Sequence, residues 1–207
     1  MIETQLILLT SVIIFSIASL FFLVLAGLKK KSLYSYAFIV SVITLVSSLV
    51  MLDGSIVALS SAGEPLYYTR WLGYIASCTL LMYSISKVVN IPQNLLARLM
   101  YLTGITMVTG ALASVASGSM MLGYFIIGGI TYTLMIVIIS SKGTNKLSWI
   151  SKYIYLGWSV FPIIFILSPE GYGVLTLSVS MILYLVLDIF TKIAFYIELG
   201  KRSLDNL

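Results

Sequence analysis

An aspartate and a lysine stand four residues apart near the end of this chain, in a segment that is otherwise apolar. The segment reads LVLDIFTKIAFYIEL over residues 185–199 and holds Asp188 and Lys192. Residues four apart share a helix face, so the carboxylate is expected about 6 Å along the axis from the amine. Burial favours loss of the lysine proton, whereas a nearby carboxylate favours the charged amine. The pair therefore suits a buried nitrogen that stays cationic at rest yet can release its proton, as a lysine joined to an aldehyde in a Schiff base must.

The composition of the chain places this pair in a membrane. Of its 207 residues, 60% are hydrophobic and 9% are charged, whereas soluble domains average about 25% charged residues. The chain has one cysteine and no histidine, which excludes a disulfide framework and histidine-ligated metal sites. We expect no metal, no enzyme activity and no nucleic-acid partner. The first residues, MIETQLILL, lack a basic segment and a cleavage site, so we expect them to begin a helix.

Seven stretches are long and apolar enough to cross a membrane, which requires about 20 residues each. They cover residues 4–28, 33–58, 66–89, 94–116, 119–140, 148–168 and 173–199. The breaks between them contain lysine runs, glycine, proline and serine. The sequence therefore predicts an all-α bundle of seven transmembrane helices, in one domain that spans residues 1–207.

The charged residues predict how this bundle is oriented. Basic residues fall in or beside alternate connections and the C-terminal tail: Lys29, Lys30, Lys31, Lys87, Arg98, Lys142, Lys146, Lys152, Lys201 and Arg202. The opposite side holds only Glu3, Glu64 and Glu170. The positive-inside rule then puts the N-terminus outside the cell and the C-terminus in the cytoplasm. Two further cations, Arg70 and Lys192, lie inside predicted spans, where a charge marks a functional site by default or an ion pair that locks helices together.

The third stretch reads RWLGYIASCTLLMYS over residues 70–84 and has a polar face. Arg70, Gly73, Ser77 and Ser84 recur at helical spacing, with Cys78 beside Ser77. Arg70, near the extracellular end, is placed to pair with Asp188 through water. The small residues of this face also suit close helix packing, so both interpretations stay open.

The sixth stretch contributes an aromatic stripe. In GWSVFPIIF, residues 157–165, the rings of Trp158, Phe161 and Phe165 share a face, with Pro162 beside them. Such a stripe is typical of ordinary core, but beside an intramembrane lysine it suits the wall of a slot for a flat apolar chromophore. The proline removes one backbone hydrogen bond, which favours a kink.

The motifs WSVFP (158–162), SPEGYG (168–173) and LVLDIFTK (185–192) resemble the sixth and seventh helices of microbial rhodopsins. This resemblance implies a seven-helix fold with all-trans retinal bound to Lys192 as a protonated Schiff base. It implies Asp188 as the counterion of that Schiff base and Arg70 as part of the extracellular charge cluster. It further implies a retinal pocket lined by Tyr74, Cys78, Leu81, Gly110, Trp158, Phe161, Pro162 and Phe165.

Some positions of this chain differ from the usual residues of microbial rhodopsins, and these differences bear on which of the family's functions it has. Outward proton pumps carry carboxylates at the places of Gly73 and Ser84, and Phe161 replaces a usual tyrosine that would bond Asp188. The segment IASCTLLMYS (75–84) and the short loops look most like the schizorhodopsins, which are light-driven inward proton pumps. Those proteins have phenylalanine and glutamate at these two places, and the glutamate assists proton release, so its absence bears on efficiency.

The leading hypothesis is an inward proton pump that releases the proton past Ser84 towards Glu198, about 9 Å beyond Lys192 along the helix. Glu198 is also interpretable as an interfacial charge that pairs with Lys201. The alternatives are a sensory photoreceptor without net transport, a light-gated channel and a seven-helix protein that binds no retinal.

The resemblance also implies where the protein is located and how it assembles. We expect a multi-pass protein of the cell membrane, in contact with the lipid bilayer, and the resemblance suggests a homotrimer. Gly128 and Gly129 are interpretable either as a window for an antenna pigment or as packing glycines. Asp53 is expected at the extracellular edge of the bundle and has no assigned role.

Overall fold

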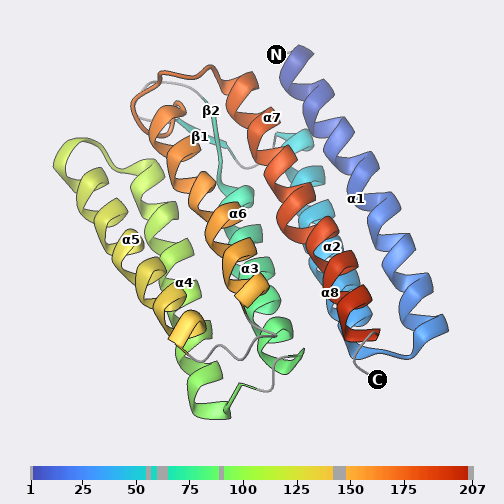
Figure 1. The fold of residues 1–207 in the computed structure, drawn as a ribbon. Helices are drawn as coiled ribbons and strands as arrows, with labels where there is room; N and C mark the ends of the chain where they lie inside the picture. The colour runs from blue at the N-terminus through green and yellow to red at the C-terminus, as the bar shows by residue number, and fades with distance from the viewer. Residues whose placement is uncertain (1, 55–56, 60–64, 89–90, 142–147, 205–207) are drawn as a thin grey trace.

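The computed structural model describes residues 2–54, 57–59, 65–88, 91–141 and 148–204, and these form a bundle of helices (Figure 1). The helices are α1 (Ile2–Lys29), α2 (Ser32–Asp53), α3 (Tyr68–Val88), α4 (Gln93–Val115), α5 (Gly118–Ser141), α6 (Ser148–Leu167), α7 (Leu177–Asp188), the π-helix η1 (Ile189–Ala194) and α8 (Phe195–Leu204). The last three follow one another without a break, so the described residues make seven helical rods, as the sequence predicts.

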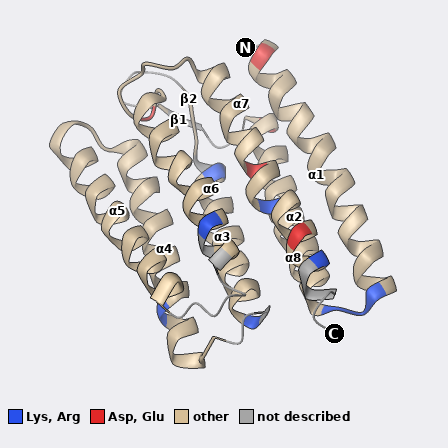
Figure 2. Ribbon diagram, viewed as in Figure 1, with Lys and Arg blue, Asp and Glu red and all other residues tan. Residues whose placement is uncertain are grey.

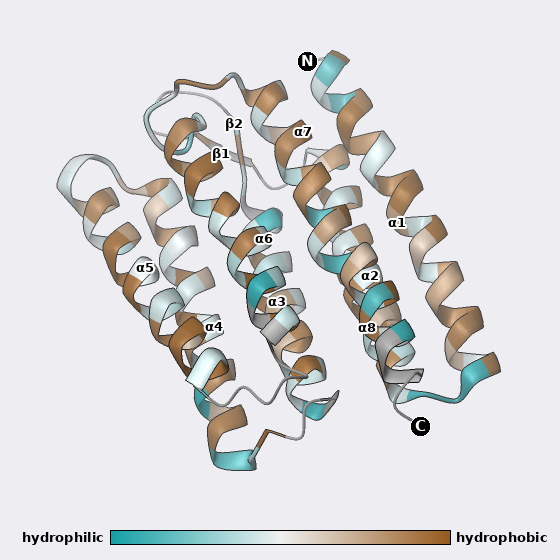
Figure 3. Ribbon diagram, in the orientation of Figure 1, coloured by the Kyte–Doolittle hydropathy of each residue, from teal (hydrophilic) through white to brown (hydrophobic). Residues whose placement is uncertain are grey.

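The outward faces of these rods are apolar, as a membrane requires (Figure 3). Among the described residues, five rods are long and apolar enough to span a bilayer: α1, α2, α4, α5 and Leu177–Lys201. The apolar part of α6 is shorter, Lys152–Leu167. Leu6, Ile17 and Leu20 on α1 are each more than 60% exposed, which fits contact with lipid because no backbone group is left unpaired along a helix.

The second predicted span is wrong at its end. We predict a helix to residue 58, whereas α2 ends at Asp53 because Gly54 adopts the left-handed conformation, with φ 71°. The chain then forms a hairpin in which β1 (Val57–Leu59) pairs antiparallel with β2 (Pro65–Tyr67). The last rod likewise begins at Leu177, not residue 173, because the Thr176 hydroxyl caps it by accepting from the Val179 N–H at 3.3 Å.

The order of packing places the last rod against helices from both the start and the later part of the chain. Helix α1 packs on α2, α2 on α3, and α4 on both α3 and α5, while α7 contacts α1 and α6. The π-helix η1 touches both α2 and α6. The rod that holds Asp188 and Lys192 is therefore surrounded by the helices that are first and sixth in sequence. Lys142, Lys146 and Glu64 lie outside the described residues.

The turn after α6 is tight and returns the chain towards the bundle. The Gly171 N–H donates to the Ser168 carbonyl at 2.9 Å and the Tyr172 N–H to the Ile166 carbonyl at 2.8 Å. A methyl group added at Gly171 would overlap the backbone carbonyl oxygens of Phe165 and Ile166. Backbone atoms cannot move aside as a flexible side chain can, so this glycine is needed for the turn.

We therefore expect Gly171→Ala to destabilise the protein by about 1–3 kcal/mol, the usual cost of overpacking. The measurement is the thermal loss of helical circular dichroism of the purified protein in detergent. Gly27→Ala is the matched control, because nothing lies within 4 Å of a methyl group there and alanine favours a helix over glycine by about 1 kcal/mol. Equal midpoints for the two variants would contradict this account of the turn.

Candidate functional site

The amine of Lys192 and the carboxylate of Asp188 form a buried ion pair. Lys192 Nζ lies 2.8 Å from Asp188 Oδ1, and the two residues are 3% and 9% exposed. Lys192 belongs to η1, and such wide turns are frequent at functional sites. A buried charge needs both an opposite charge and hydrogen bonds. The surrounding helices supply these.

Two neighbouring helices complete the contacts of this pair. Lys192 Nζ donates to Thr44 Oγ1 on α2 at 3.2 Å and lies 4.6 Å from the centre of the Tyr74 ring on α3. The Tyr74 hydroxyl donates to Asp188 Oδ2 at 3.3 Å. Each Asp188 oxygen therefore has a partner, and the ammonium lies between an anion, a hydroxyl and an aromatic face. Lys192 also lines an apolar cavity.

That cavity is apolar and ends at Lys192. Its empty volume, counting the open space at its mouth, is about 880 Å³. All eight residues that the sequence proposes as a pocket lining lie around it: Tyr74, Cys78, Leu81, Gly110, Trp158, Phe161, Pro162 and Phe165. Side chains from α3, α4 and α6 are thus brought together with the amine, and the space fits a flat apolar group attached to Nζ.

The walls of the cavity are rings in mutual contact. Phe165 stacks on Phe125 of α5 at a centroid distance of 5.8 Å, and its edge meets Trp71 at 5.9 Å. Phe161 meets Tyr74 at 5.6 Å. A methyl group added at Gly110 would overlap the Trp71 ring. The indole of Trp71 on α3 packs directly on the backbone of α4 at Gly110, so a larger residue does not fit there. The sequence alone does not show this reason for the glycine.

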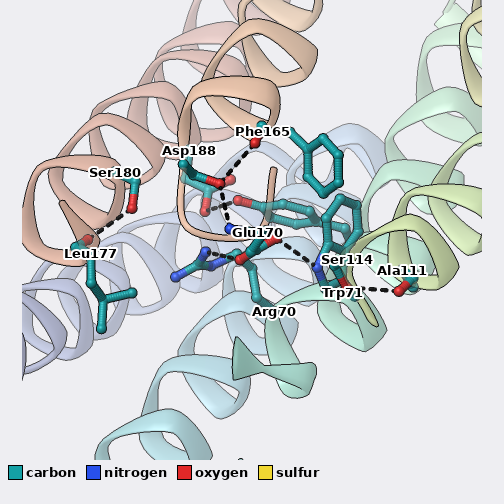
Figure 4. Close-up of polar contacts among 11 residues, drawn as sticks. Arg70, Trp71, Ala111, Ser114, Phe165, Glu170, Leu177, Ser180 and Asp188 are labelled. Carbon is teal, nitrogen blue, oxygen red and sulfur yellow. Dashed lines mark hydrogen bonds and ion pairs between the residues drawn. The ribbon is translucent and has the colours of Figure 1, made fainter. Parts of the chain in front are cut away.

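Arg70 forms its direct ion pair with Glu170 in the turn after α6, at 3.1 Å. The sequence predicts a water-mediated pair with Asp188, so this partner is unexpected. The indole N–H of Trp71 donates to the other Glu170 oxygen at 3.2 Å, and Figure 4 shows both side chains pointing at that carboxylate. Burial raises the pKa of Glu170, and the Arg70 charge and the Trp71 N–H oppose the rise. The guanidinium also lies 4.5 Å from the Tyr184 ring.

The small residues of α3 have different environments. A methyl group at Gly73 would lie 2.9 Å from Ser47 Oγ, so Ser47 occupies the space that a larger side chain would use. Ser77 Oγ is buried and has no hydrogen-bond partner among the described residues. Ser84 Oγ donates to the Leu81 carbonyl and is 2.8 Å from the Tyr196 hydroxyl.

Glu198 lies in the first turn of α8 and is half-buried. The ring of Phe195, three residues before Glu198, lies 5.1 Å from the ring of Tyr153, so this part of the rod packs on α6. The structure thus keeps Glu198 on the same rod as Lys192, beyond Tyr196.

Four residues of the site were not identified from the sequence: Thr44, Glu170, Tyr184 and Tyr196. A signal existed for Thr44, because Ser41, Thr44 and Ser48 share one face of α2 by spacing and all three are buried. For Glu170 and Tyr196 the partners are 100 and 112 residues away, and no local pattern reports such a contact.

Comparisons with known proteins agree with this geometry. Residues 3–200 match the model of a family described as bacteriorhodopsin-like protein. The crystal structure of schizorhodopsin 4 is 33% identical, covers 94% of this chain and 96% of its own, and superposes with a TM-score of 0.89. Bacteriorhodopsin of Halobacterium salinarum is 23% identical over 80% of this chain and 69% of its own length. Sensory rhodopsin-2 of Haloarcula vallismortis is 20% identical over 67% of this chain and 64% of its own.

The Arg70–Glu170 pair generates a stability prediction. Glu170→Ala leaves a guanidinium buried without a counter-charge, and we expect it to lower the free energy of unfolding by about 3–5 kcal/mol. The double variant Arg70→Leu/Glu170→Leu removes both charges and should recover part of this loss. Thermal unfolding of the purified proteins measures both effects. If the double variant were less stable than Glu170→Ala by the full cost of a second deletion, the two residues would not act as a pair.

Proposed function

This chain belongs to the bacteriorhodopsin-like family of microbial rhodopsins, and on that premise we propose that it is a light-driven inward proton pump with all-trans retinal on Lys192. The family binds retinal and consists of light-driven transporters and sensors rather than enzymes. We further propose that residues 1–207 form one seven-helix domain in the membrane. The observation that supports inward transfer most directly is the set of groups around Lys192 Nζ.

The residues present fit retinal. When bound, retinal supplies absorption of visible light and a light-induced isomerisation. The apolar cavity excludes water from its length, and the rings of Trp158, Phe161 and Phe165 fix a flat group in one plane. Lys192 Nζ, at the end of this cavity, is the attachment atom. Pro162, which lies within α6, interrupts the backbone hydrogen bonds beside the cavity and permits that helix to move.

Asp188 keeps the proton on Nζ at rest and is a poor place to deliver it. One oxygen of Asp188 contacts Nζ and the other accepts from Tyr74. In the part of the chain that the structure describes, Asp188 is the carboxylate that lies within 4 Å of Nζ. Position 73 is a glycine backed by Ser47, so the third helix offers no acceptor carboxylate on that side. A proton that leaves Nζ therefore has its better outlet along the other half of the bundle.

The orientation of the bundle makes that outlet cytoplasmic. Figure 2 shows basic residues gathered at the end of the bundle near the C-terminus, where Lys29 ends α1 and Lys87 and Arg98 flank the connection between α3 and α4. By the positive-inside rule this end faces the cytoplasm and the N-terminus faces outside. Ser84, Tyr196 and Glu198 lie between Lys192 and that end, so they line the exit side.

A sensory photoreceptor is the second candidate. Ser84 is a hydroxyl bonded to Tyr196, not a carboxylate that takes up or releases a proton readily. A slow proton exit lengthens the light cycle, which suits signalling, and one relative is a sensory rhodopsin by name.

Cells that express the protein with all-trans retinal should become coloured, and Lys192→Ala should abolish the colour because it removes the attachment atom. Illumination of such cells in unbuffered medium should raise the external pH, and a protonophore should abolish this change. External acidification would overturn the inward direction. Absence of any pH change in coloured cells would favour the sensor.

The exit side yields a second prediction. Ser84→Glu should increase the initial rate of light-driven alkalinisation severalfold, because a carboxylate beside Tyr196 can accept and pass on a proton. Ser84→Gln, which has the same shape without an ionisable group, is the matched control and should not increase it. Equal rates in the two variants would show that proton exit at Ser84 does not limit transport.

A further inference from the structure

A second cavity adjoins the ion pair, and Tyr74, Tyr184 and Lys192 line both it and the apolar cavity. It lies among α1, α2, α3 and α7 and includes Arg70, Gly73, Asp188 and Lys192 in its lining. Four hydroxyl-bearing residues also line it: Ser11, Thr44, Ser47 and Ser48. We call this space the inner chamber. The centre of a water molecule can occupy about 30 Å³ of it, which is enough for at least one ordered water held by these polar groups.

The hydroxyls of the inner chamber lead to Lys192. Nζ contacts Thr44 Oγ1 at 3.2 Å, Ser48 Oγ donates to the Thr44 carbonyl at 2.9 Å, and Ser11 Oγ lies 2.8 Å from Ser48 Oγ. Because Ser48 uses its hydrogen on that carbonyl, Ser11 is the donor to Ser48. All three are buried, with Ser48 only 1% exposed. The Thr44 hydroxyl itself donates to the Val40 carbonyl at 2.9 Å, so the hydroxyls of Ser48 and Thr44 are not bonded to each other, and water in the inner chamber is needed to connect them.

A larger space lies beyond this chamber at the end of the bundle that holds the N-terminus. It is lined by Thr4, Gln5, Asp53, Gly54, Pro65, Tyr67, Thr176 and Ser178 together with apolar residues, and water centres can occupy about 410 Å³ of it. We call it the outer vestibule. Asp53 is exposed and is the carboxylate in its described lining. By the proposed orientation this vestibule faces outside the cell.

One layer of apolar side chains separates the two spaces. Leu8 and Met51 line both the chamber and the vestibule, and they cluster with Met181, which is 3% exposed. Methionine is unbranched and flexible and adopts several shapes at small cost. The layer therefore closes the path at rest and can let water pass after a small movement.

The alternative path beside Arg70 is occupied. The guanidinium is tied to Glu170 and lies against the Tyr184 ring, and Trp71 holds the same carboxylate. A proton that entered from outside along this path would have to displace the buried guanidinium of Arg70. The side of the inner chamber formed by Ser11, Ser48 and Thr44 holds no such charge.

We propose that the proton that replaces the one lost from Lys192 enters from the outer vestibule, with Asp53 as its collecting group, passes the layer of Leu8, Met51 and Met181, and reaches Nζ through water of the inner chamber that the hydroxyls of Ser11, Ser48 and Thr44 hold. In each transfer an O–H bond breaks as the next forms, and the last proton bonds to the Nζ lone pair, with no oxidation or reduction. This route rests on the proposed function, because inward transport needs proton uptake from outside.

Flash photolysis of the pigment in detergent tests the route. Ser48→Ala should slow the recovery of the protonated pigment by about tenfold, less than the hundredfold typical of a direct proton donor, because water remains in the chamber. The rate of proton loss should not change. Ser86→Ala is the control, since Ser86 is buried on α3 and its hydroxyl has no partner among the described residues. Asp53→Asn should also slow recovery, because it removes the collecting carboxylate.

Met51→Ala tests the apolar layer and should change the recovery rate in the opposite direction to Ser48→Ala. It widens the apolar layer, so recovery should become severalfold faster, an outcome that poor folding cannot produce. Unchanged recovery in Ser48→Ala and Met51→Ala, with light-driven alkalinisation intact in the parent protein, would overturn the route and leave the inward pump standing. A parent protein that acidifies the medium would instead overturn the pump, so the two failures are distinguishable.

Discussion

The rest of the structure depends on a buried ion pair between two side chains of the same rod. Lys192 Nζ and Asp188 Oδ1 are 2.8 Å apart in surroundings where either charge alone would cost several kcal/mol. Their spacing is local to one helix, but their remaining hydrogen-bonding capacity is not. Thr44 and Tyr74 come from two other helices and fill it. The requirement to satisfy these two charges therefore fixes how α2 and α3 pack on the last rod.

A second buried ion pair, between Arg70 and Glu170, lies apart from the first. Glu170 holds Arg70 and also Trp71, and Trp71 in turn packs on Gly110 at the wall of the apolar cavity. The turn after α6 is thereby coupled to the shape of that cavity. Because Arg70 has a carboxylate of its own, Asp188 is left with Lys192 and Tyr74 as its direct partners among the described residues.

The sequence predicted best what is encoded within one helix. The Asp188–Lys192 spacing and the stripe of Trp158, Phe161 and Phe165 follow from helical periodicity alone, and the structure brings these residues to one cavity. The wrong end of the second span has a local cause too, the left-handed Gly54 and the strand pairing after it. The partners of Arg70 and Ser84 could not be predicted, because Glu170 and Tyr196 lie far along the chain and their depth depends on how whole rods pack.

The two sides of Lys192 differ mainly in the surroundings of their hydroxyl groups. On the proposed exit side, Ser84 donates to a backbone carbonyl and meets Tyr196, and both are fully buried. On the other side, the hydroxyls border a space large enough for water and lead towards a vestibule with a carboxylate. In the proposed direction, uptake needs only small side-chain movements, whereas release needs the hydrogen bond between Ser84 on α3 and Tyr196 on α8 to open. With retinal on Nζ, light would act between the two sides, and the release step, which requires helices to move, is the one that isomerisation would drive.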